Sequence, residues 1–318
     1  MALTLAWVSG CARTDPECDS LPNPTDVPDC PDVYLGQGDI YEPGPLAVRR
    51  VQVAACELDA PRAMLVFAPE PEGSYPVIQF QHGFMSSNFQ YTQLLEHVAS
   101  HGFIVVAPQM YEPGLRALFG QPTAAEEAET AERIMEWLPG NLDTITGLRA
   151  CTERLGLVGH SRGGKVAWLV LTSRPEAIEA IAGVDPVDST GGPLGGQDRV
   201  ITGPFDFSVP ALIIGAELSG LCAPEGENHV QFYEASAPPA WHAVVPEGGH
   251  ADMLDDDAPG VHLARLLCPG GPDTDGMRRL TAGLLVALFR GTLQDDPDAF
   301  LLLDDTEAAP KAYTIESK

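Results

Sequence analysis

The sequence predicts an α/β domain in which a mostly parallel central sheet of about eight strands carries helices on both faces. Two observations predict this fold class. Short apolar runs alternate with helical stretches along most of the chain, which is typical of parallel strands joined by helices. Many of these runs are apolar at consecutive positions, as expected for strands that are buried on both faces.

The expected elements follow one another in an order that fits this fold class. The expected strands are 46–54, 63–68, 77–81, 104–107, 155–159, 180–184, 211–215 and 243–245. The expected helices are 91–101, 124–137, 163–172 and 277–290. The first two strands have no helix between them, so they predict an antiparallel hairpin at the edge of the sheet.

These elements define one domain over residues 46–301. Residues 12–45 are crowded with Pro, Asp, Gly and Cys, which predicts an exposed tether before the domain. Residues 302–318 are polar and predict a loose C-terminal tail. With 44% hydrophobic residues the chain can bury a sizeable core, and no run of 18 apolar residues predicts a membrane-spanning helix.

The charge balance narrows the range of partners. The chain has 18 Lys and Arg against 45 Asp and Glu, a formal net charge of −27. Such a surface repels phosphate backbones and anionic lipid, so nucleic-acid binding is not expected. A neutral or cationic small molecule, or one held by apolar contacts, is favoured instead. The oligomeric state does not follow from the sequence.

The N-terminus predicts a lipid anchor. A short apolar stretch at 1–8 leads into Ser9 and Gly10 before Cys11, which resembles the end of a bacterial lipoprotein signal. On this reading Cys11 carries lipid, and the protein is expected in the bacterial cell envelope or secreted. The alternative is an apolar N-terminus without this role.

The remaining cysteines predict disulfides. The chain has 7 cysteines, so six are left if Cys11 is lipidated, enough for three bridges in an oxidising compartment. Proximity along the chain favours Cys18 with Cys30 and Cys222 with Cys268, although six cysteines allow 15 connectivities. Neither a CxxC pair nor Cys/His zinc spacing is present, so no metal and no cofactor are expected.

A strand, a sharp turn and a helix surround one serine. The strand 155–159 runs into GHSRG at 159–163, and a helical pattern follows. In this context the G-x-S-x-G motif places its serine in a strained conformation at the tip of a turn, where side chains at Gly159 and Gly163 would collide with backbone. Ser161 would also lie near a helix N-terminus, which favours developing negative charge. The motif predicts an α/β-hydrolase fold with Ser161 as nucleophile.

An acyl-transfer serine also needs donors for an oxyanion. The strand 77–81 is followed by His82-Gly83-Phe84, a loop typical of this fold. We expect the backbone N–H groups of Arg162 and Phe84 to form the oxyanion hole, with Met85 as the alternative to Phe84. His82 is expected to brace the loop and not to act as base.

The base and the acid should follow the nucleophile along the chain. His250 lies in a glycine-containing turn just after the strand 243–245 and is the expected base, with His229 as an alternative. Asp185 ends the strand 180–184 before a rigid proline and is the expected acid. Glu217, at the end of the next strand, and Asp188 remain alternatives.

Four side chains after sheet strands are expected near the cleft and are predicted to contact an apolar substrate: Phe84, Met85, Phe89 and Tyr111. The acidic run of Asp252 with 255–257 could be a calcium site, but a solvated helix N-terminus is the favoured interpretation.

Several segments resemble the chlorophyllase family. They are GHSRGGK at 159–165, GVDPV at 183–187, CAP at 222–224 with NH at 228–229 and FY at 232–233, and GHADMLDDD at 249–257. The resemblance covers about residues 60–290. It implies a triad of Ser161, Asp185 and His250, independently favouring Asp185 over Glu217, and an ester of a long hydrophobic alcohol as substrate.

The resemblance leaves the substrate open, because a lipoprotein-like start and an acidic charge are unlike a plastid enzyme. Besides a chlorophyllase-like ester hydrolase, the sequence is compatible with a secreted hydrolase that cleaves polyesters or lipid esters without acting on chlorophyll. A catalytically silent, surface-anchored binding protein is the third alternative, against which the complete set of Ser, Asp and His speaks.

Overall fold

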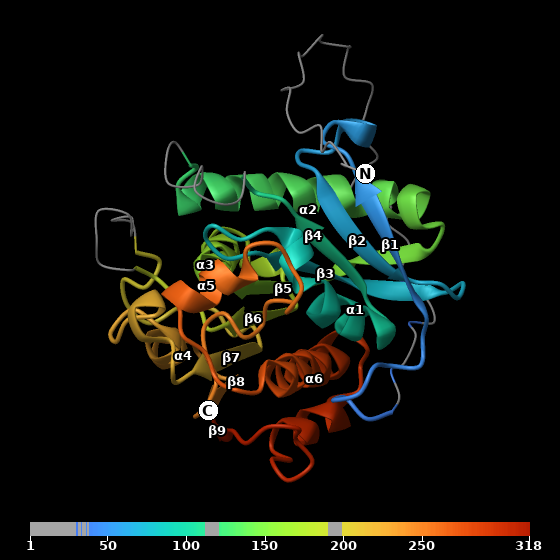
Figure 1. The fold of residues 1–318 in the computed structure, drawn as a ribbon. Coiled ribbons are helices and arrows are strands. Elements are labelled where there is room, and N and C mark those ends of the chain that lie inside the picture. Colours follow the sequence, from blue (N-terminus) through green and yellow to red (C-terminus); the bar gives the residue numbers. More distant parts are fainter. Residues whose placement is uncertain (1–29, 31–32, 34–35, 37, 112–120, 190–198) are drawn as a thin grey trace.

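The computed structural model describes residues 30, 33, 36, 38–111, 121–189 and 199–318, and these form one layered α/β domain (Figure 1). Its centre is a 9-stranded sheet with the order β1-β2-β4-β3-β5-β6-β7-β8-β9. The predicted α/β-hydrolase fold class, with helices on both faces of a mostly parallel sheet, is confirmed.

The six central strands, β3 to β8, are parallel to one another, whereas β1 and β2 at one edge and β9 at the other pair antiparallel. The strands are β1 (Val48–Val53), β2 (Met64–Pro69), β3 (Ser74–Gln81), β4 (Ile104–Pro108), β5 (Arg149–His160), β6 (Ala180–Val184), β7 (Ala211–Ala216), β8 (Ala240–Val245) and β9 (Thr314–Ser317). As predicted, β1 and β2 pair antiparallel at one edge, with the short 3₁₀ helix η2 (Glu57–Asp59) between them.

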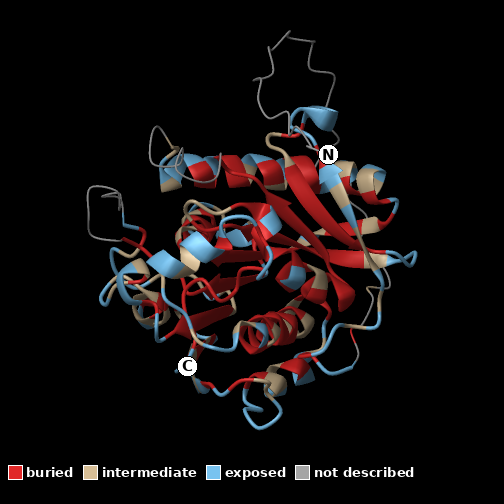
Figure 2. Cartoon of the chain, in the orientation of Figure 1, coloured by how far each residue is buried: buried red, intermediate tan, exposed pale blue. Residues whose placement is uncertain are grey.

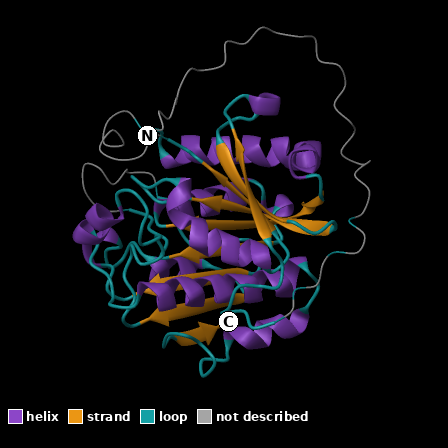
Figure 3. Cartoon of the chain, turned by 45° about the vertical axis from the view of Figure 1, so that its right-hand side comes forward, coloured by secondary structure: helices purple, strands orange, loops and turns teal. Residues whose placement is uncertain are grey.

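Two helical layers bury the faces of the sheet (Figures 1 and 3). The α-helices are α1 (Thr92–Ser100), α2 (Ala124–Thr146), α3 (Arg162–Ser173), α4 (His229–Ala235), α5 (Val261–Leu267) and α6 (Thr274–Leu293). One core cluster joins α1 and α6 to the sheet, and the other joins α2, α3 and α4 to the opposite face. The central strands are therefore largely buried, as Figure 2 shows, with β5 partly exposed in its first half.

Within the described residues, four further 3₁₀ helices lie in the connections, at η3 (Asn88–Tyr91), η5 (Pro175–Ala177), η6 (Gly220–Cys222) and η7 (Pro297–Leu303). Of these, η3 follows β3 and η6 follows β7, so both lie where parallel strands reach their carboxyl ends. Among the described residues, no helix is long and apolar enough to span a bilayer.

The C-terminus differs from the predicted loose tail. Within 302–318, the strand β9 pairs antiparallel with β8, from Thr314 opposite Val244 to Ser317 opposite Trp241. Tyr313 is buried and its hydroxyl donates to the Leu303 carbonyl, 2.7 Å away. This end of the chain therefore covers β8 with a short, largely exposed edge strand.

The predicted tether differs in the same way where the structure describes it. Ile40 and Tyr41 are each 3% exposed and belong to the core cluster around α1 and α6. Upstream, Cys30 is disulfide-bonded to Cys151 on β5, with 5.5 Å between their Cα atoms. The described part of residues 12–45 is thus part of the domain, while Cys11 and the predicted lipid anchor lie outside the described residues.

Of the two disulfides predicted from proximity along the chain, one is present and one is not. Cys222 and Cys268 are bonded as predicted. The prediction of Cys18 with Cys30 is wrong, because Cys30 pairs with Cys151 across 121 residues of sequence. Cys56 is also disulfide-bonded.

Candidate active site

The nucleophile candidate, Ser161, is the single residue between a strand and a helix. His160 ends β5 and Arg162 begins α3, so Ser161 alone makes the turn, at φ +56° and ψ −124°. A Cβ on Gly159 would collide with the carbonyl of Gly163, and a Cβ on Gly163 would collide with the carbonyl of Gln81. The strained bend predicted from the sequence is therefore present, and its glycines are required by close backbone contacts.

The histidine candidate follows β8. The Nε2 of His250 lies 2.8 Å from Ser161 Oγ across 89 residues of sequence. Its loop is held by Asp252, whose carboxylate accepts the backbone N–H groups of Gly249 and Gly271 at 2.8 Å each. The loop also packs so closely that a Cβ on Gly249 would collide with Gly270.

The acid candidate follows β6 and is fully buried. Asp185 has a positive φ of 41°, and its Oδ2 lies 2.6 Å from His250 Nδ1. Its Oδ1 accepts the Ala216 N–H at 3.1 Å, and the Ser219 hydroxyl donates to Oδ2. Burial raises the pKa of this carboxyl, but the hydrogen bonds from His250 and Ser219 and the electrostatic interaction with the His250 ring outweigh burial and leave the pKa lowered.

Together these contacts fix which atoms donate and which accept hydrogen bonds along the row Ser161–His250–Asp185. Because Asp185 accepts the hydrogen bond of His250 Nδ1–H, the unprotonated Nε2 faces the Ser161 hydroxyl and accepts from it. Such an arrangement can remove the proton of Ser161 while the carboxylate stabilises the imidazolium that forms.

The loop after β3 also lies next to the nucleophile candidate, Ser161. The Ser86 N–H donates to the Gly83 carbonyl at 3.1 Å, which closes a tight turn with Phe84 and Met85 at its tip. Met85 has a positive φ of 61°. A Cβ on Gly83 would lie 3.3 Å from Ser161 Cβ, so the loop lies directly against the nucleophile.

Two buried side chains brace this loop. The Nε2 of His82 accepts the Met110 N–H at 3.0 Å, and its Nδ1 lies 3.0 Å from the Gly83 carbonyl. Burial lowers the pKa of His82 to about 4, so the ring stays neutral. The Tyr111 hydroxyl donates to the same carbonyl at 2.8 Å. His82 therefore has the bracing position predicted for it, in the loop and outside the Ser161–His250–Asp185 row.

The side chains of the two expected oxyanion residues touch. The guanidinium carbon of Arg162 lies 5.3 Å from the centre of the Phe84 ring. Glu127 on α2 holds that guanidinium from behind, with its Oε1 2.7 Å from Arg162 Nε, and the Pro122 carbonyl accepts from Nη2. Burial raises the pKa of Glu127 to about 7, against the opposing charge of Arg162. The roles of the Phe84 and Arg162 backbone N–H groups remain a prediction.

Comparison with known proteins places the chain in a family. The chlorophyllase family model matches residues 37–316. The chain belongs to the chlorophyllase family. Chlorophyllase-2 of Arabidopsis thaliana is 36% identical over 266 residues, covering 77% of this chain and 82% of that protein. The chloroplastic chlorophyllase-1 of Citrus sinensis is 34% identical over 272 residues, covering 80% of each.

Outside the chlorophyllases, a bacterial cutinase is also similar. Cutinase est1 of Thermobifida alba is 26% identical over 192 residues, covering 60% of this chain and 58% of the cutinase. Since both groups are named for ester cleavage, the chlorophyllase-family chain described here is a carboxylic ester hydrolase by relationship.

In this chlorophyllase-family chain the alternative acids and base lie elsewhere. Glu217 is exposed, and its backbone N–H donates to Val245. The Asp188 carboxylate accepts the N–H groups of Val200 and Ile201. His229 lies 2.8 Å from the ring of His242. Neither carboxylate contacts the His250 ring that Asp185 contacts.

The four expected substrate contacts divide by exposure. Phe84 and Met85 are half-buried at the tip of their turn, and Phe89 is 39% exposed. Tyr111 is only 6% exposed, with its hydroxyl bound to the loop and its ring 6.1 Å from that of Phe84. The structure therefore assigns Tyr111 to the support of the loop, while the other three have surface available for contact.

The acidic run after His250 divides into buried Asp252 and Asp255 and exposed Asp256 and Asp257. Asp255 accepts the Gln93 N–H at 3.1 Å, and Asp256 pairs with Arg278 at 2.7 Å. The next helix, α5, begins only at Val261, so the predicted helix N-terminus at this run is wrong. Asp255 and Asp256 therefore hold the loop to α1 and α6.

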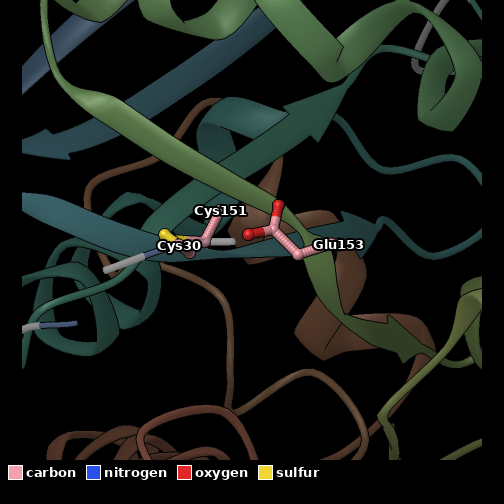
Figure 4. A group of neighbouring side chains, drawn as sticks. All are labelled: Cys30, Cys151 and Glu153. Atoms are coloured by element: carbon pink, nitrogen blue, oxygen red, sulfur yellow. A yellow bond between two sulfur atoms is a disulfide. The ribbon is translucent and has the colours of Figure 1, made fainter. Parts of the chain in front are cut away.

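One close group of potential metal ligands occurs in the described part of the chain: Cys30, Cys151 and Glu153. Figure 4 shows that the two sulfur atoms are bonded to each other. A disulfide offers no thiolate, so this group does not have the chemistry of a metal site.

Three residues close to the row were not predicted from the sequence. Ser219 holds the acid, while Tyr91 and His160 connect the loops around it. Of these three, only His160 could have been singled out from the sequence, because it is the variable residue before the serine in the G-x-S-x-G motif. The contacts of all three are set by tertiary structure.

Proposed function

We propose that this chain is a serine carboxylic ester hydrolase that works through an acyl-enzyme. One observation supports it most: the Ser161 hydroxyl, on a strained bend, lies 2.8 Å from a histidine whose other nitrogen is bound to a buried carboxylate. Ser161 is the proposed nucleophile, His250 the base and Asp185 the acid.

The proposed reaction has two steps that use the same groups. His250 Nε2 takes the proton of Ser161 as Oγ attacks the ester carbonyl, and the tetrahedral oxyanion is held by the backbone N–H groups of Phe84 and Arg162. The alcohol leaves with the proton from His250. Water then attacks the acyl-enzyme by the same route and releases the acid. Each oxyanion donor is expected to lower the barrier by about 3 kcal/mol.

The proposed substrate is a neutral small-molecule ester with a large hydrophobic part. Phe84, Met85 and Phe89 offer apolar surface beside the expected oxyanion hole. Membership of the chlorophyllase family makes chlorophyll the first ester to test. The similarity to a cutinase favours a polyester as the second candidate.

Covalent labelling tests the mechanism. A fluorophosphonate should label the purified protein at Ser161, and Ser161→Ala should abolish both labelling and ester hydrolysis. Ser173→Ala, on the last turn of α3 and outside the row, is the matched control and should label like the wild type. A folded wild-type protein that does not label would instead favour a silent binding protein.

A substrate panel tests the specificity. We expect higher kcat/KM on long than on short p-nitrophenyl esters, and no cleavage of the matched amides. Chlorophyll and a polyester film, tested in parallel, distinguish the two candidate substrates. A preference for amides would refute the esterase proposal.

We also propose that the protein is exported and lipid-anchored at Cys11 in a bacterial envelope. The described disulfides and disulfide-bonded Cys56 support an oxidising compartment. Expression in a bacterium with an alkyne-labelled fatty acid should label the wild type and not Cys11→Ser. Equal labelling of the wild type and Cys11→Ser would refute the proposed lipid anchor at Cys11.

A further inference from the structure

Three loops must be held in register for the proposed reaction, and they come from distant parts of the sequence. The oxyanion loop follows β3, the nucleophile follows β5 and the base follows β8. A single chain of hydrogen bonds joins all three. The Gly83 N–H donates to the Tyr91 hydroxyl at 3.1 Å, which lies 2.7 Å from His160 Nδ1, while His160 Nε2 lies 2.8 Å from the His250 carbonyl.

The protons in this chain have one consistent arrangement. The Tyr91 oxygen accepts from Gly83, so its own hydrogen is free to donate to His160 Nδ1. With Nδ1 accepting, the neutral His160 ring carries its hydrogen on Nε2 and donates it to the His250 carbonyl. Within these hydrogen bonds, Tyr91 and His160 thus each accept one bond and donate one, and none of the bonds needs a charged group.

The surroundings of this hydrogen-bond chain keep its groups neutral. Tyr91 is 0%, His160 3% and His250 6% exposed. Burial lowers the pKa of His160 to about 3 and raises that of Tyr91 to about 12, so both stay neutral over the working range. The His160 ring also packs against the rings of Tyr91 and His250, with centroids 5.6 and 4.8 Å away.

From this geometry we propose that Tyr91 and His160 are positioning residues, which set the distance between the oxyanion loop, Ser161 and the His250 ring. The proposal rests on the proposed ester hydrolysis. Neither residue would touch the substrate. They act through backbone groups, one on the oxyanion loop and one on the histidine itself, so their loss should misplace reacting groups while leaving substrate contacts in place.

Removing the tyrosine hydroxyl tests the first half of the chain. Tyr91→Phe should lower kcat on a p-nitrophenyl ester about 10-fold, with KM changed less than about twofold, because small misplacements slow reaction steps more than binding. Tyr75→Phe is the matched control. Tyr75 is also buried, on β3, but its hydroxyl donates to the Pro71 carbonyl before the start of that strand.

Two substitutions of His160 test the second half. Glutamine places an amide N–H near the position of Nε2 and can still donate to the His250 carbonyl. Asparagine places its amide near Nδ1 and can serve Tyr91 alone. If the bond to His250 positions the base, His160→Gln should retain several-fold more kcat than His160→Asn. A residue that only fills space would give both variants the same rate.

All rates are expressed per active site titrated with a fluorophosphonate, so a partly folded variant is still informative. Equal kcat for His160→Gln and His160→Asn, or a loss in Tyr91→Phe no larger than in Tyr75→Phe, overturns the proposal. Wild-type protein that neither labels nor cleaves esters would instead refute the proposed function, so the two failures are distinguishable.

Discussion

At the scale of single residues, the charge of Asp185 matters most to the proposed mechanism. The carboxylate is fully buried, yet it accepts hydrogen bonds from His250, Ser219 and the Ala216 backbone. Those donors all favour the ionised form, which is the form that can stabilise an imidazolium. A neutral side chain of the same shape would keep the packing and lose that stabilisation.

Asp185→Asn should therefore lower kcat about 10⁴-fold, since an amide can also hold His250 in the wrong tautomer. The variant should remain folded, which circular dichroism checks beside the steady-state rate. Glu217→Gln is the control, because Glu217 is exposed at the end of the next strand and should keep the wild-type rate. An equal loss of kcat in both variants would mean that Asp185 is not the acid and would favour Glu217 instead.

Glu127 predicts a pH dependence of stability. Its pKa rises from 4.5 to about 7 on folding, because burial outweighs the nearby Arg162 charge. Between these values the native protein holds a proton that the unfolded chain has lost, so rising pH lowers stability there by up to about 1.4 kcal/mol per pH unit.

Replacing this group should remove that dependence. The free energy of unfolding of wild type minus that of Glu127→Gln should fall from pH 5 to pH 7 and then level off. Urea titrations of both proteins at each pH measure the difference. A difference that does not change with pH would mean that Glu127 ionises in the folded protein as it does in the unfolded chain.

At the scale of elements, local constraints were readable from the sequence and distant pairings were not. The bend at Ser161 could be predicted, because neighbouring backbone excludes any Cβ at Gly159 and Gly163. The helix α2 was predicted only to residue 137. It continues to Thr146 past a kink, where Pro139 and Gly140 leave helical geometry.

The strand β9 shows the opposite case. Residues Thr314–Ser317 are largely exposed and carry no apolar pattern of their own, so nothing local distinguishes them from a tail. Their order comes from pairing with β8. The bond of Cys30 to Cys151 is similar, since 121 residues separate its partners and only the folded sheet brings them together. Contacts of this kind are decided by tertiary structure.

Deleting residues 314–318 should therefore destabilise the domain. The deletion removes the ladder with β8 and the contact of Glu316 with His242, and it makes the mostly buried strand β8 the edge of the sheet. We expect Tm to fall by about 5 °C or more, with association visible in size-exclusion chromatography. Glu316→Gln, which keeps the ladder, separates the two causes and should stay close to wild type.

At the scale of the whole molecule, the fold collects the proposed machinery at the carboxyl ends of its parallel strands. The nucleophile, acid and base follow β5, β6 and β8, and the oxyanion loop follows β3. The site is thus assembled from four loops on one rigid sheet. It lies within a chain of net charge −27, and its acid and base are buried.

This net charge should discriminate between substrates before they reach the site. An anionic ester is repelled by the whole chain, whereas a neutral ester of the same size is not. At low ionic strength, kcat/KM should be about 10-fold lower for p-nitrophenyl hydrogen succinate than for its neutral methyl ester. Raising the salt from 0.01 to 0.1 M shortens the screening length from about 30 to about 10 Å and should narrow this gap. The same salt dependence for both esters would mean that the acidic surface does not act on the approaching substrate.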